Sequence, residues 1–191
     1  MKRRQTLARP LRGFTFLEML VAMAVLGVLL TVAAPAFHFM WTSVRMSAAT
    51  NDFLGALRLA RSSALRLNRT VVMCVSSDAQ SCDQNADWHA GWMVFVDNNQ
   101  NGLRDGEDER LIRTQGGVAG VRIIGNSAVR SFVSWRSNGT MRRGTGRGSP
   151  QMGTVTFCPD ADNTARQIVL NIGGRARIQA VSGATPAVCG R

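Results

Sequence analysis

An uncharged, apolar run of twenty residues near the N-terminus constrains this chain more than any other feature. Residues 19–38 (MLVAMAVLGVLLTVAAPAFH) contain no aspartate, glutamate, lysine or arginine. An α-helix rises about 1.5 Å per residue, so a helix of this length crosses the roughly 30 Å hydrocarbon core of a bilayer. Residues 1–13 carry five basic residues and no acidic one. Because positively charged flanks stay in the cytoplasm, we expect a membrane-spanning helix with the rest of the chain on the far side.

Three kinds of segment share this pattern. A cleaved secretory signal peptide is favoured by the small residues 32–34, but the apolar run is long for one and Pro35 lies close to the expected cut. A plain membrane anchor is the second interpretation. The third rests on Glu18, because a carboxylate within an apolar membrane segment is costly and needs a partner. Neither a signal peptide nor a plain anchor has a use for that carboxylate.

The residues around Glu18 resemble a known processing signal. Arg12–Leu20 (RGFTFLEML) is similar to the class III signal of type IV pilins and pseudopilins. The resemblance implies that residues 1–13 are a leader peptide, that a prepilin peptidase cuts between Gly13 and Phe14, and that the new N-terminal residue is methylated. It also implies that Glu18 compensates the N-terminal amine of a neighbouring subunit during assembly.

A helical stripe continues beyond the apolar run. Apolar residues recur at spacings of four, three, four and three, at Phe53, Leu57, Ala60, Ala64 and Leu67. These spacings place the five side chains on one face of a helix. The charged residues Asp52, Arg58, Arg61 and Arg66 lie off that face. We therefore expect one long helix with a transmembrane half over residues 14–38 and an amphipathic half over residues 39–68 that packs on the strands that follow.

Residues 69–191 are expected to form a β-rich globular head. Short runs of β-branched and aromatic residues, separated by turns rich in glycine and asparagine, predict strands. The expected strands cover residues 70–75, 91–96, 110–113, 120–124, 131–135, 154–158, 168–172 and 175–181. The expected fold class is α+β and pilin-like, with a long N-terminal helix packed on an antiparallel β-sheet head.

The four cysteines favour an oxidising compartment. Cys74 and Cys82 lie eight residues apart, and Cys158 and Cys189 bracket the last expected strands. Neither spacing resembles a zinc pattern, and no histidine clusters with these residues. Four cysteines allow three disulfide pairings. Proximity favours Cys74 with Cys82 and Cys158 with Cys189, which suits a head outside the inner membrane, where disulfides persist.

The segment 97–108 (DNNQNGLRDGED) has two interpretations. Oxygen-bearing side chains stand at positions 1, 3, 5, 9 and 12 of an EF-hand calcium loop: Asp97, Asn99, Asn101, Asp105 and Asp108. Asp108 replaces the longer bidentate glutamate, however, and a strand rather than a helix leads into the loop. Residues 88–109 also resemble a block of GspH/FimT-type minor pilins and pseudopilins that implies no metal. We favour a hydrophilic hairpin loop without a metal, and a calcium-dependent structural head stays an alternative.

The C-terminal part is strongly basic, with twelve arginines and two acidic residues over residues 110–191. Such an imbalance suggests an anionic partner. Residues 154–177 resemble the C-terminal block of FimT-like minor pilins, in which a Gly-Arg-x-Arg element binds DNA during natural transformation. Gly174, Arg175 and Arg177 match that element. The resemblance implies that these residues contact DNA.

The physical chemistry agrees with that expectation. Arg175 and Arg177 are two residues apart, so on a strand they share a face about 7 Å apart and can engage successive backbone phosphates. Such binding is independent of base sequence and weakens steeply with salt. Arg142, Arg143 and Arg147, in a glycine-arginine loop, are expected to add contacts.

No catalytic motif stands out. The chain has neither a Gly-Lys-Ser/Thr phosphate loop nor a Gly-x-Ser-x-Gly elbow, and its two histidines, His38 and His89, have no evident catalytic partners. We therefore expect a protein that is not an enzyme and that carries no cofactor.

The sequence leads to one functional hypothesis and one alternative. The first is a GspH/FimT-family minor pilin of a type IV pilus that assists assembly and binds double-stranded DNA for uptake. It would cross the bacterial inner membrane once, with its head in the periplasm, and its partners would be other pilins and prepilin peptidase. The alternative is a minor pseudopilin of a type II secretion system that contacts an exoprotein or other pseudopilins.

Overall fold

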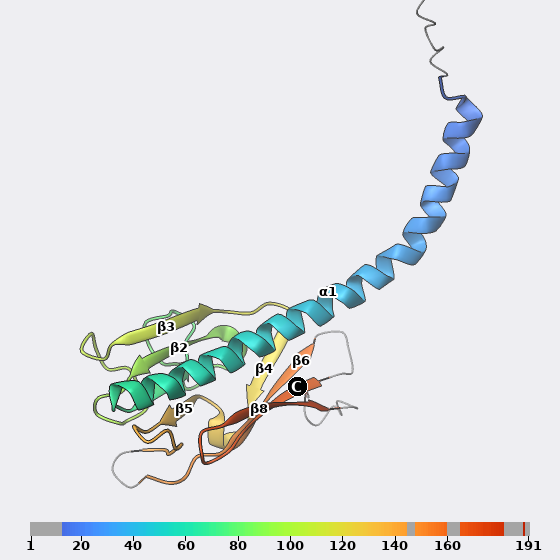
Figure 1. The fold of residues 1–191 in the computed structure, drawn as a ribbon. Coiled ribbons are helices and arrows are strands. Elements are labelled where there is room, and N and C mark those ends of the chain that lie inside the picture. The colour runs from blue at the N-terminus through green and yellow to red at the C-terminus, as the bar shows by residue number, and fades with distance from the viewer. Residues whose placement is uncertain (1–12, 145–147, 160–164, 182–188, 190–191) are drawn as a thin grey trace, which may run out of the picture. The chain divides into compact units, whose positions relative to one another are not determined.

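The computed structural model describes residues 13–144, 148–159, 165–181 and 189. The chain divides into two compact units, Met1–Trp41 and Thr42–Arg191. One helix, α1 (Phe16–Leu67), begins in the first unit and ends in the second, and every strand shown in Figure 1 belongs to the second unit.

A capping box starts α1. The hydroxyl oxygen Oγ1 of Thr15 accepts a hydrogen bond from the N–H of Glu18 at 3.3 Å, and Oε2 of Glu18 accepts one from the N–H of Thr15 at 3.4 Å. A Thr-x-x-Glu pair of this kind satisfies two of the N–H groups at the helix start. Glu18 therefore has a partner within its own chain in this structure.

The first unit exposes its apolar side chains. All side chains of residues 13–31 are exposed, and Phe14 reaches 87% and Phe16 82% of full exposure. Among the residues described by the structure, no helix combines the length and the apolar character that crossing a membrane requires. The membrane-spanning half over residues 14–38 therefore stays a prediction.

The end of α1 is set by Asn68, whose φ of 52° lies in the left-handed region. Asparagine tolerates this conformation better than other residues with a side chain, and it commonly ends a helix. The N–H of Arg69 donates to the carbonyl oxygen of Ala64 at 3.3 Å and so closes the last turn. The last residue of the helix is Leu67.

Over the described residues, eight strands form two four-stranded antiparallel sheets. The first sheet has the order β3 (Leu111–Gly116), β2 (Gly91–Val96), β1 (Val71–Val75) and β5 (Phe132–Trp135). The second has the order β4 (Val121–Gly125), β6 (Gly153–Pro159), β7 (Ala165–Leu170) and β8 (Ala176–Val181). Two 3-10 helices, η1 (Trp88–Ala90) and η2 (Ser127–Val129), lie in the connections.

The antiparallel head is confirmed, and its division into two sheets is new. β5 returns to pair with β1, whereas β4 pairs with β6. Strand periodicity carries no information about which strand pairs with which, so the sequence could not show this division. The strand expected over residues 168–172 spans Ala165–Leu170 instead, because a turn begins at Asn171, whose carbonyl oxygen accepts a hydrogen bond from the N–H of Gly174 at 2.9 Å.

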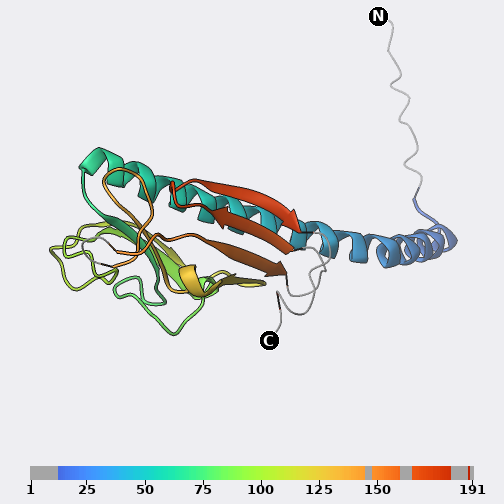
Figure 2. The same ribbon diagram turned by 90° about the horizontal axis from the view of Figure 1, so that it is seen from below.

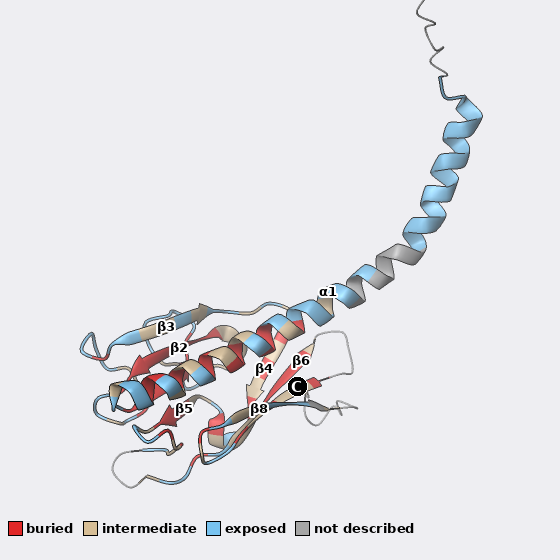
Figure 3. Cartoon of the chain, viewed as in Figure 1, coloured by how far each residue is buried: buried red, intermediate tan, exposed pale blue. Residues whose placement is uncertain are grey.

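The second half of α1 buries its apolar stripe against both sheets. Figure 2 shows this half of the helix lying along the strands, and Figure 3 shows its buried residues on the face turned toward them. Phe53 lies at the centre of this core. Its ring packs edge-on against Trp88, Trp92 and Phe157, with ring centroids 5.2, 6.3 and 5.5 Å away. Because Trp92 belongs to β2 and Phe157 to β6, one helical residue joins the two sheets into a single core.

Both disulfides join the pairs that proximity favoured. Cys74 is bonded to Cys82 and Cys158 to Cys189, with Cα atoms 5.7 Å apart in each case. The first disulfide closes a loop over the outer face of the first sheet, where a small second core lies around Val72, Cys74, Met93 and Phe95. The second ties Cys189 to β6, and the guanidinium of Arg122 also donates to the Cys189 carbonyl oxygen.

A buried glutamine completes the hydrogen bonding of β5, which lies at one end of the first sheet. The side-chain oxygen of Gln151 accepts a hydrogen bond from the N–H of Ser134 at 2.9 Å. Its amide nitrogen donates to the carbonyl oxygens of Ala128 at 3.0 Å and Phe132 at 2.9 Å. A buried backbone group without a hydrogen-bond partner raises the free energy of the folded state. The side chain of Gln151 therefore supplies hydrogen bonds to β5 that a neighbouring strand supplies elsewhere in the sheet.

Candidate nucleic-acid interface

The turn between β7 and β8 holds the Gly-Arg-x-Arg element in a fixed conformation. The side-chain oxygen of Asn171 accepts a hydrogen bond from the N–H of Arg175 at 3.0 Å, and the N–H of Asn171 donates to the carbonyl oxygen of Arg175 at 3.1 Å. Gly174 is buried and has a φ of 73°, in the region that favours glycine. Both the left-handed backbone conformation and the burial of residue 174 therefore favour glycine there.

Close packing adds a second reason for glycine at position 174. A Cβ atom built there would collide with the carbonyl oxygen of Gly139 and lie 2.9 Å from Cδ1 of Trp135. The indole nitrogen of Trp135 donates to the carbonyl oxygen of Gly174 at 3.3 Å. The turn is therefore pressed against the end of β5, and the first sheet supports the loop that presents Arg175.

Arg175 and Arg177 are exposed and line one surface hollow with Val169, Asn171 and Ala176. Arg177 pairs with Val169 in the β7–β8 register, so both lie on the outer face of the second sheet. Ala176 pairs with the buried Leu170 and packs toward the core. Both arginines line one hollow, with Arg177 on β8 and Arg175 in the turn one residue before that strand begins.

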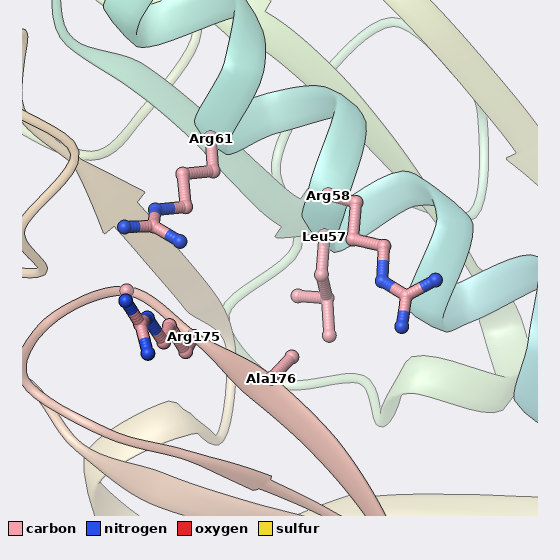
Figure 4. A pocket seen from close by; sticks show the side chains of 6 residues that line it. Leu57, Arg58, Arg61, Arg175 and Ala176 are labelled. Atoms are coloured by element: carbon pink, nitrogen blue, oxygen red, sulfur yellow. The ribbon is translucent and has the colours of Figure 1, made fainter.

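Helix α1 brings two further arginines to this site. Arg58 and Arg61 line a second hollow with Leu57, Gly174, Arg175 and Ala176, and Figure 4 shows the guanidinium groups of Arg61 and Arg175 at the same opening. The Nε–H of Arg61 donates to the carbonyl oxygen of Gly139 at 3.3 Å. Sequence reasoning noted Arg58 and Arg61 as lying beside the apolar stripe of the helix, but it did not connect them with Arg175.

Every charged residue that lines these two hollows is an arginine. Neither hollow has an acidic residue in its lining. The ion pair between Arg113 and Asp52 involves none of the arginines of this site. An arrangement of guanidinium groups without carboxylates suits the binding of phosphate oxygens.

Two arginines of the glycine-arginine loop, Arg142 and Arg143, have contacts elsewhere. Arg142 donates from Nη1 to the carbonyl oxygen of Gly148 within its own loop at 3.0 Å. Arg143 lies over the ring of Phe132, with its guanidinium carbon 5.2 Å from the ring centroid. Neither residue lines the two hollows. Arg147 lies outside the described residues, so its expected DNA contact is untested.

The loop between β2 and β3 directs its oxygen atoms toward its own N–H groups. Asp97 accepts hydrogen bonds from the N–H groups of Gln100 at 2.6 Å and Gly102 at 2.9 Å. Asp105 accepts hydrogen bonds from the side-chain amides of Asn99 at 2.6 Å and Asn101 at 2.5 Å. Burial raises the pKa of the Asp97 carboxyl, and the nearby charge of Glu109 adds to this effect.

A network of this kind is typical of a hairpin connection rich in turn residues. In the described ranges, no three side chains of histidine, cysteine, aspartate or glutamate lie close enough together to hold a metal ion. Asp108 would be the last ligand in the calcium-loop alternative, and its backbone carbonyl oxygen accepts a hydrogen bond from the side-chain amide of Asn98.

The expected cleavage site lies in the first unit. Gly13 and Phe14 are exposed and precede α1, and they line an open pocket together with Thr15 and Glu18. A peptide bond that is exposed and outside a helix is accessible to a peptidase.

Comparison with protein families gives matches over two segments of the chain. The family model described as Type II transport protein GspH matches residues 49–174. The Prokaryotic N-terminal methylation motif matches residues 9–34, which contain Gly13, Phe14 and Glu18. Comparison with curated proteins gives no match.

Solved structures of pilin-like proteins share the fold. The type IV minor pilin FimU of Pseudomonas aeruginosa (strain PAO1) has 19% sequence identity and a TM-score of 0.55 over 73% of this chain and 95% of its own. A second crystal form of FimU gives 20% identity and a TM-score of 0.53 over 73% and 99%. The minor pseudopilin EpsH from the type 2 secretion system of Vibrio cholerae has 10% identity and a TM-score of 0.47 over 71% and 97%. At these identities the likeness to FimU shows the fold alone, and we base no argument on EpsH.

Proposed function

The chain belongs to the GspH family, whose members are minor pilins and pseudopilins, and from this premise we propose that it serves in a type IV pilus, where it assists assembly and binds DNA. A protein of this kind acts through its surfaces and has no need of a catalytic centre. The proposal therefore concerns two surfaces: the N-terminal segment, which joins other pilins, and the arginine-rich end of the second sheet.

One observation carries the DNA-binding part of the proposal. Arg175 and Arg177 are exposed, line the same hollow, and have no acidic neighbour in that hollow. Side chains two residues apart on a strand stand about 7 Å apart, which suits two successive phosphates of one DNA strand. Each guanidinium can hold a phosphate through two parallel hydrogen bonds. The contacts would go to the backbone, so the binding would not depend on base sequence.

The N-terminal segment supports the assembly part. We propose that prepilin peptidase cuts between the exposed residues Gly13 and Phe14 and that the amine of Phe14 is then methylated. Residues 14–38 would anchor the chain in the bacterial inner membrane in a single pass, with the head in the periplasm. Their exposed apolar side chains need a lipid or protein environment, and the two disulfides of the head suit an oxidising compartment.

Glu18 would change partners on processing. Its carboxylate accepts a hydrogen bond from the N–H of Thr15 in this structure. Cleavage at Gly13 creates a positively charged amine on Phe14, and a neighbouring subunit then offers a stronger, charged partner for a carboxylate in an apolar surrounding. We propose that Glu18 pairs with that amine during assembly.

DNA binding is tested with the full chain in a neutral detergent. Affinity for a short labelled DNA duplex is measured across a salt series for the wild type, for Arg175→Ala/Arg177→Ala, and for Arg110→Ala/Arg130→Ala. The control pair removes the same charge from exposed residues that line neither hollow. We expect binding that weakens with salt and that only the first variant loses. Absence of binding by the wild type at low salt, or equal loss in both variants, would refute the DNA-binding proposal.

The second candidate is a minor pseudopilin of a type II secretion system. The description of the matched family model, Type II transport protein GspH, favours it. In this case the head contacts an exoprotein or other pseudopilins. Deletion of the gene separates the two candidates. If the protein serves in a type IV pilus, the deletion should abolish DNA uptake and leave protein secretion normal. If it is a pseudopilin, the deletion should abolish secretion and leave DNA uptake normal.

A further inference from the structure

Two arginines of α1 extend the proposed DNA-binding site beyond the Gly-Arg-x-Arg element. Arg58 and Arg61 lie more than one hundred residues before Arg175 in the sequence, yet the three side chains line one hollow. Figure 4 shows them around the opening between α1 and the start of β8. Leu57 and Ala176 also line this hollow and supply apolar surface.

The two hollows described above meet at the start of β8. Arg175 and Ala176 line both of them. Arg58 and Arg61 line only the hollow beside α1, and Arg177 lines only the hollow on the outer face of the second sheet. The four arginines therefore line two adjoining hollows at the start of β8, and Arg175 is the one arginine among them that lines both.

We infer that Arg58, Arg61, Arg175 and Arg177 form one binding surface, the arginine track, which holds the phosphate backbone of a DNA duplex as it crosses from α1 to the outer face of the second sheet. This inference rests on the proposed function, because it assumes that Arg175 and Arg177 bind DNA. It adds that the helix supplies half of the charged contacts.

The electrostatics of the arginine track favour a polyanion. Four arginines line two adjoining hollows, and none of them belongs to the ion pair between Arg113 and Asp52. Bound phosphates reduce the mutual repulsion of the four arginines. The release of condensed counterions from the DNA also favours binding. A DNA backbone, with its repeating phosphates, can contact all four arginines of the track. A single small anion could contact only one or two of them.

Hydrogen bonds that do not use the terminal guanidinium nitrogens position Arg61 and Arg175. Arg61 uses its Nε–H on the carbonyl oxygen of Gly139, which leaves the terminal N–H groups of its fork for a ligand. The backbone of Arg175 is bound on both sides to Asn171. Arg58 makes no hydrogen bond within the part of the chain that the structure describes, so its removal changes charge and little else.

The test compares four variants of the full chain in a neutral detergent: Arg58→Ala/Arg61→Ala, Arg175→Ala/Arg177→Ala, the single Arg58→Ala, and the control Arg110→Ala/Arg130→Ala. The probe is a short labelled DNA duplex, and affinity is measured by fluorescence anisotropy at rising sodium chloride. Melting temperature is measured alongside.

We expect Arg58→Ala/Arg61→Ala to weaken binding about tenfold and to reduce the slope of log K against log salt by about two, because each lost phosphate contact removes about one. Arg58→Ala alone should weaken binding with an unchanged melting temperature, so a folding defect cannot account for the loss. The control pair should change affinity by less than about twofold, since its charges lie off the track.

The outcomes separate this inference from the proposed function. If the wild type binds, Arg175→Ala/Arg177→Ala loses binding, and both α1 variants bind like the control, the arginine track is wrong and the proposed function stands. If the wild type does not bind DNA at low salt, the proposed function itself fails. Loss of affinity and of salt slope in the α1 variants, with an intact fold, supports the arginine track.

Discussion

The indole N–H of Trp135 donates to the carbonyl oxygen of Gly174 at 3.3 Å and thereby connects the two sheets of the head. Trp135 ends β5 in the first sheet, and Gly174 lies in the turn between β7 and β8 in the second. The ring of Trp135 is fully buried. The arginine that follows Gly174 is therefore presented by a loop that rests on the core, and mutations of this support should affect both stability and DNA binding.

Gly174→Ala should destabilise the head by about 2–4 kcal/mol, because the left-handed backbone disfavours a side chain and the new Cβ collides with Gly139. Unfolding by urea, followed by tryptophan fluorescence, measures this change. Gly173→Ala is the matched control, since a Cβ there meets only the side-chain oxygen of Asn171 at 3.5 Å. Equal stability of the two variants would contradict the role of Gly174.

Gln151→Leu should cost about 3 kcal/mol, because it leaves the buried N–H of Ser134 and the partly buried carbonyl oxygens of Ala128 and Phe132 without this partner. The neighbouring Met152 is 53% exposed, so Met152→Ala should stay within about 0.5 kcal/mol of the wild type. Both values come from urea unfolding. A Gln151→Leu variant as stable as the wild type would show that the three backbone groups find other partners.

The two disulfides should differ in their contribution to stability. They close loops of 31 and 8 residues, and the chain-entropy estimate gives about 4 kcal/mol for the longer loop and about 2.5 kcal/mol for the shorter one. We expect Cys158→Ala/Cys189→Ala to lower the free energy of unfolding more than Cys74→Ala/Cys82→Ala does. The reverse order would indicate that packing of Cys74 in the small second core outweighs loop length.

Asp97 should make the head less stable as pH rises. Burial raises the pKa of its carboxyl above the ordinary value of 3.8, with a smaller contribution from Glu109. The folded state thus favours the protonated form, so the contribution of Asp97 is fully present below the unfolded pKa and is lost as pH rises through the folded pKa. Urea unfolding measures the free energy of unfolding as pH rises from 3.8 through the folded-state pKa. In Asp97→Asn this free energy should lack the decline that Asp97 causes in the wild type. An identical pH profile in the variant would contradict the prediction.

Asp78 provides the opposite case. Hydrogen bonds from the N–H groups of Ser81 and Gln80, at 2.9 and 2.8 Å, lower the pKa of its carboxyl. Its contribution to stability is therefore present above the ordinary value of 3.8 and is lost as pH falls through the folded pKa. Asp78→Asn should remove this acid-sensitive part of the profile, measured in the same unfolding series.

Several features of the protein could be predicted from the sequence because they depend on neighbours in the chain. The processing signal around Gly13 is a linear motif, and a matching family motif covers it. The buried face of α1 follows from the spacing of Phe53, Leu57, Ala60 and Ala64, all of which are buried. The strands follow from short β-branched runs, and the shared site of Arg175 and Arg177 follows from the period of a strand. Each of these conclusions needs only local geometry.

Other features depend on contacts between residues that are distant in the sequence, so only the tertiary structure decided them. The division into two sheets results from the return of β5 to β1, which no local pattern encodes. Gln151 has the appearance of a loop residue, and its burial depends on the free edge of β5. Arg58 and Arg61 line one hollow with Arg175 because the buried face of α1 packs on both sheets and places these two arginines beside the start of β8. The sequence by itself determined the processing signal, the helix and strands, and the close spacing of Arg175 and Arg177. Long-range packing, whose free energy depends on the whole core, decided that Arg58 and Arg61 of the helix line the same hollow as Arg175.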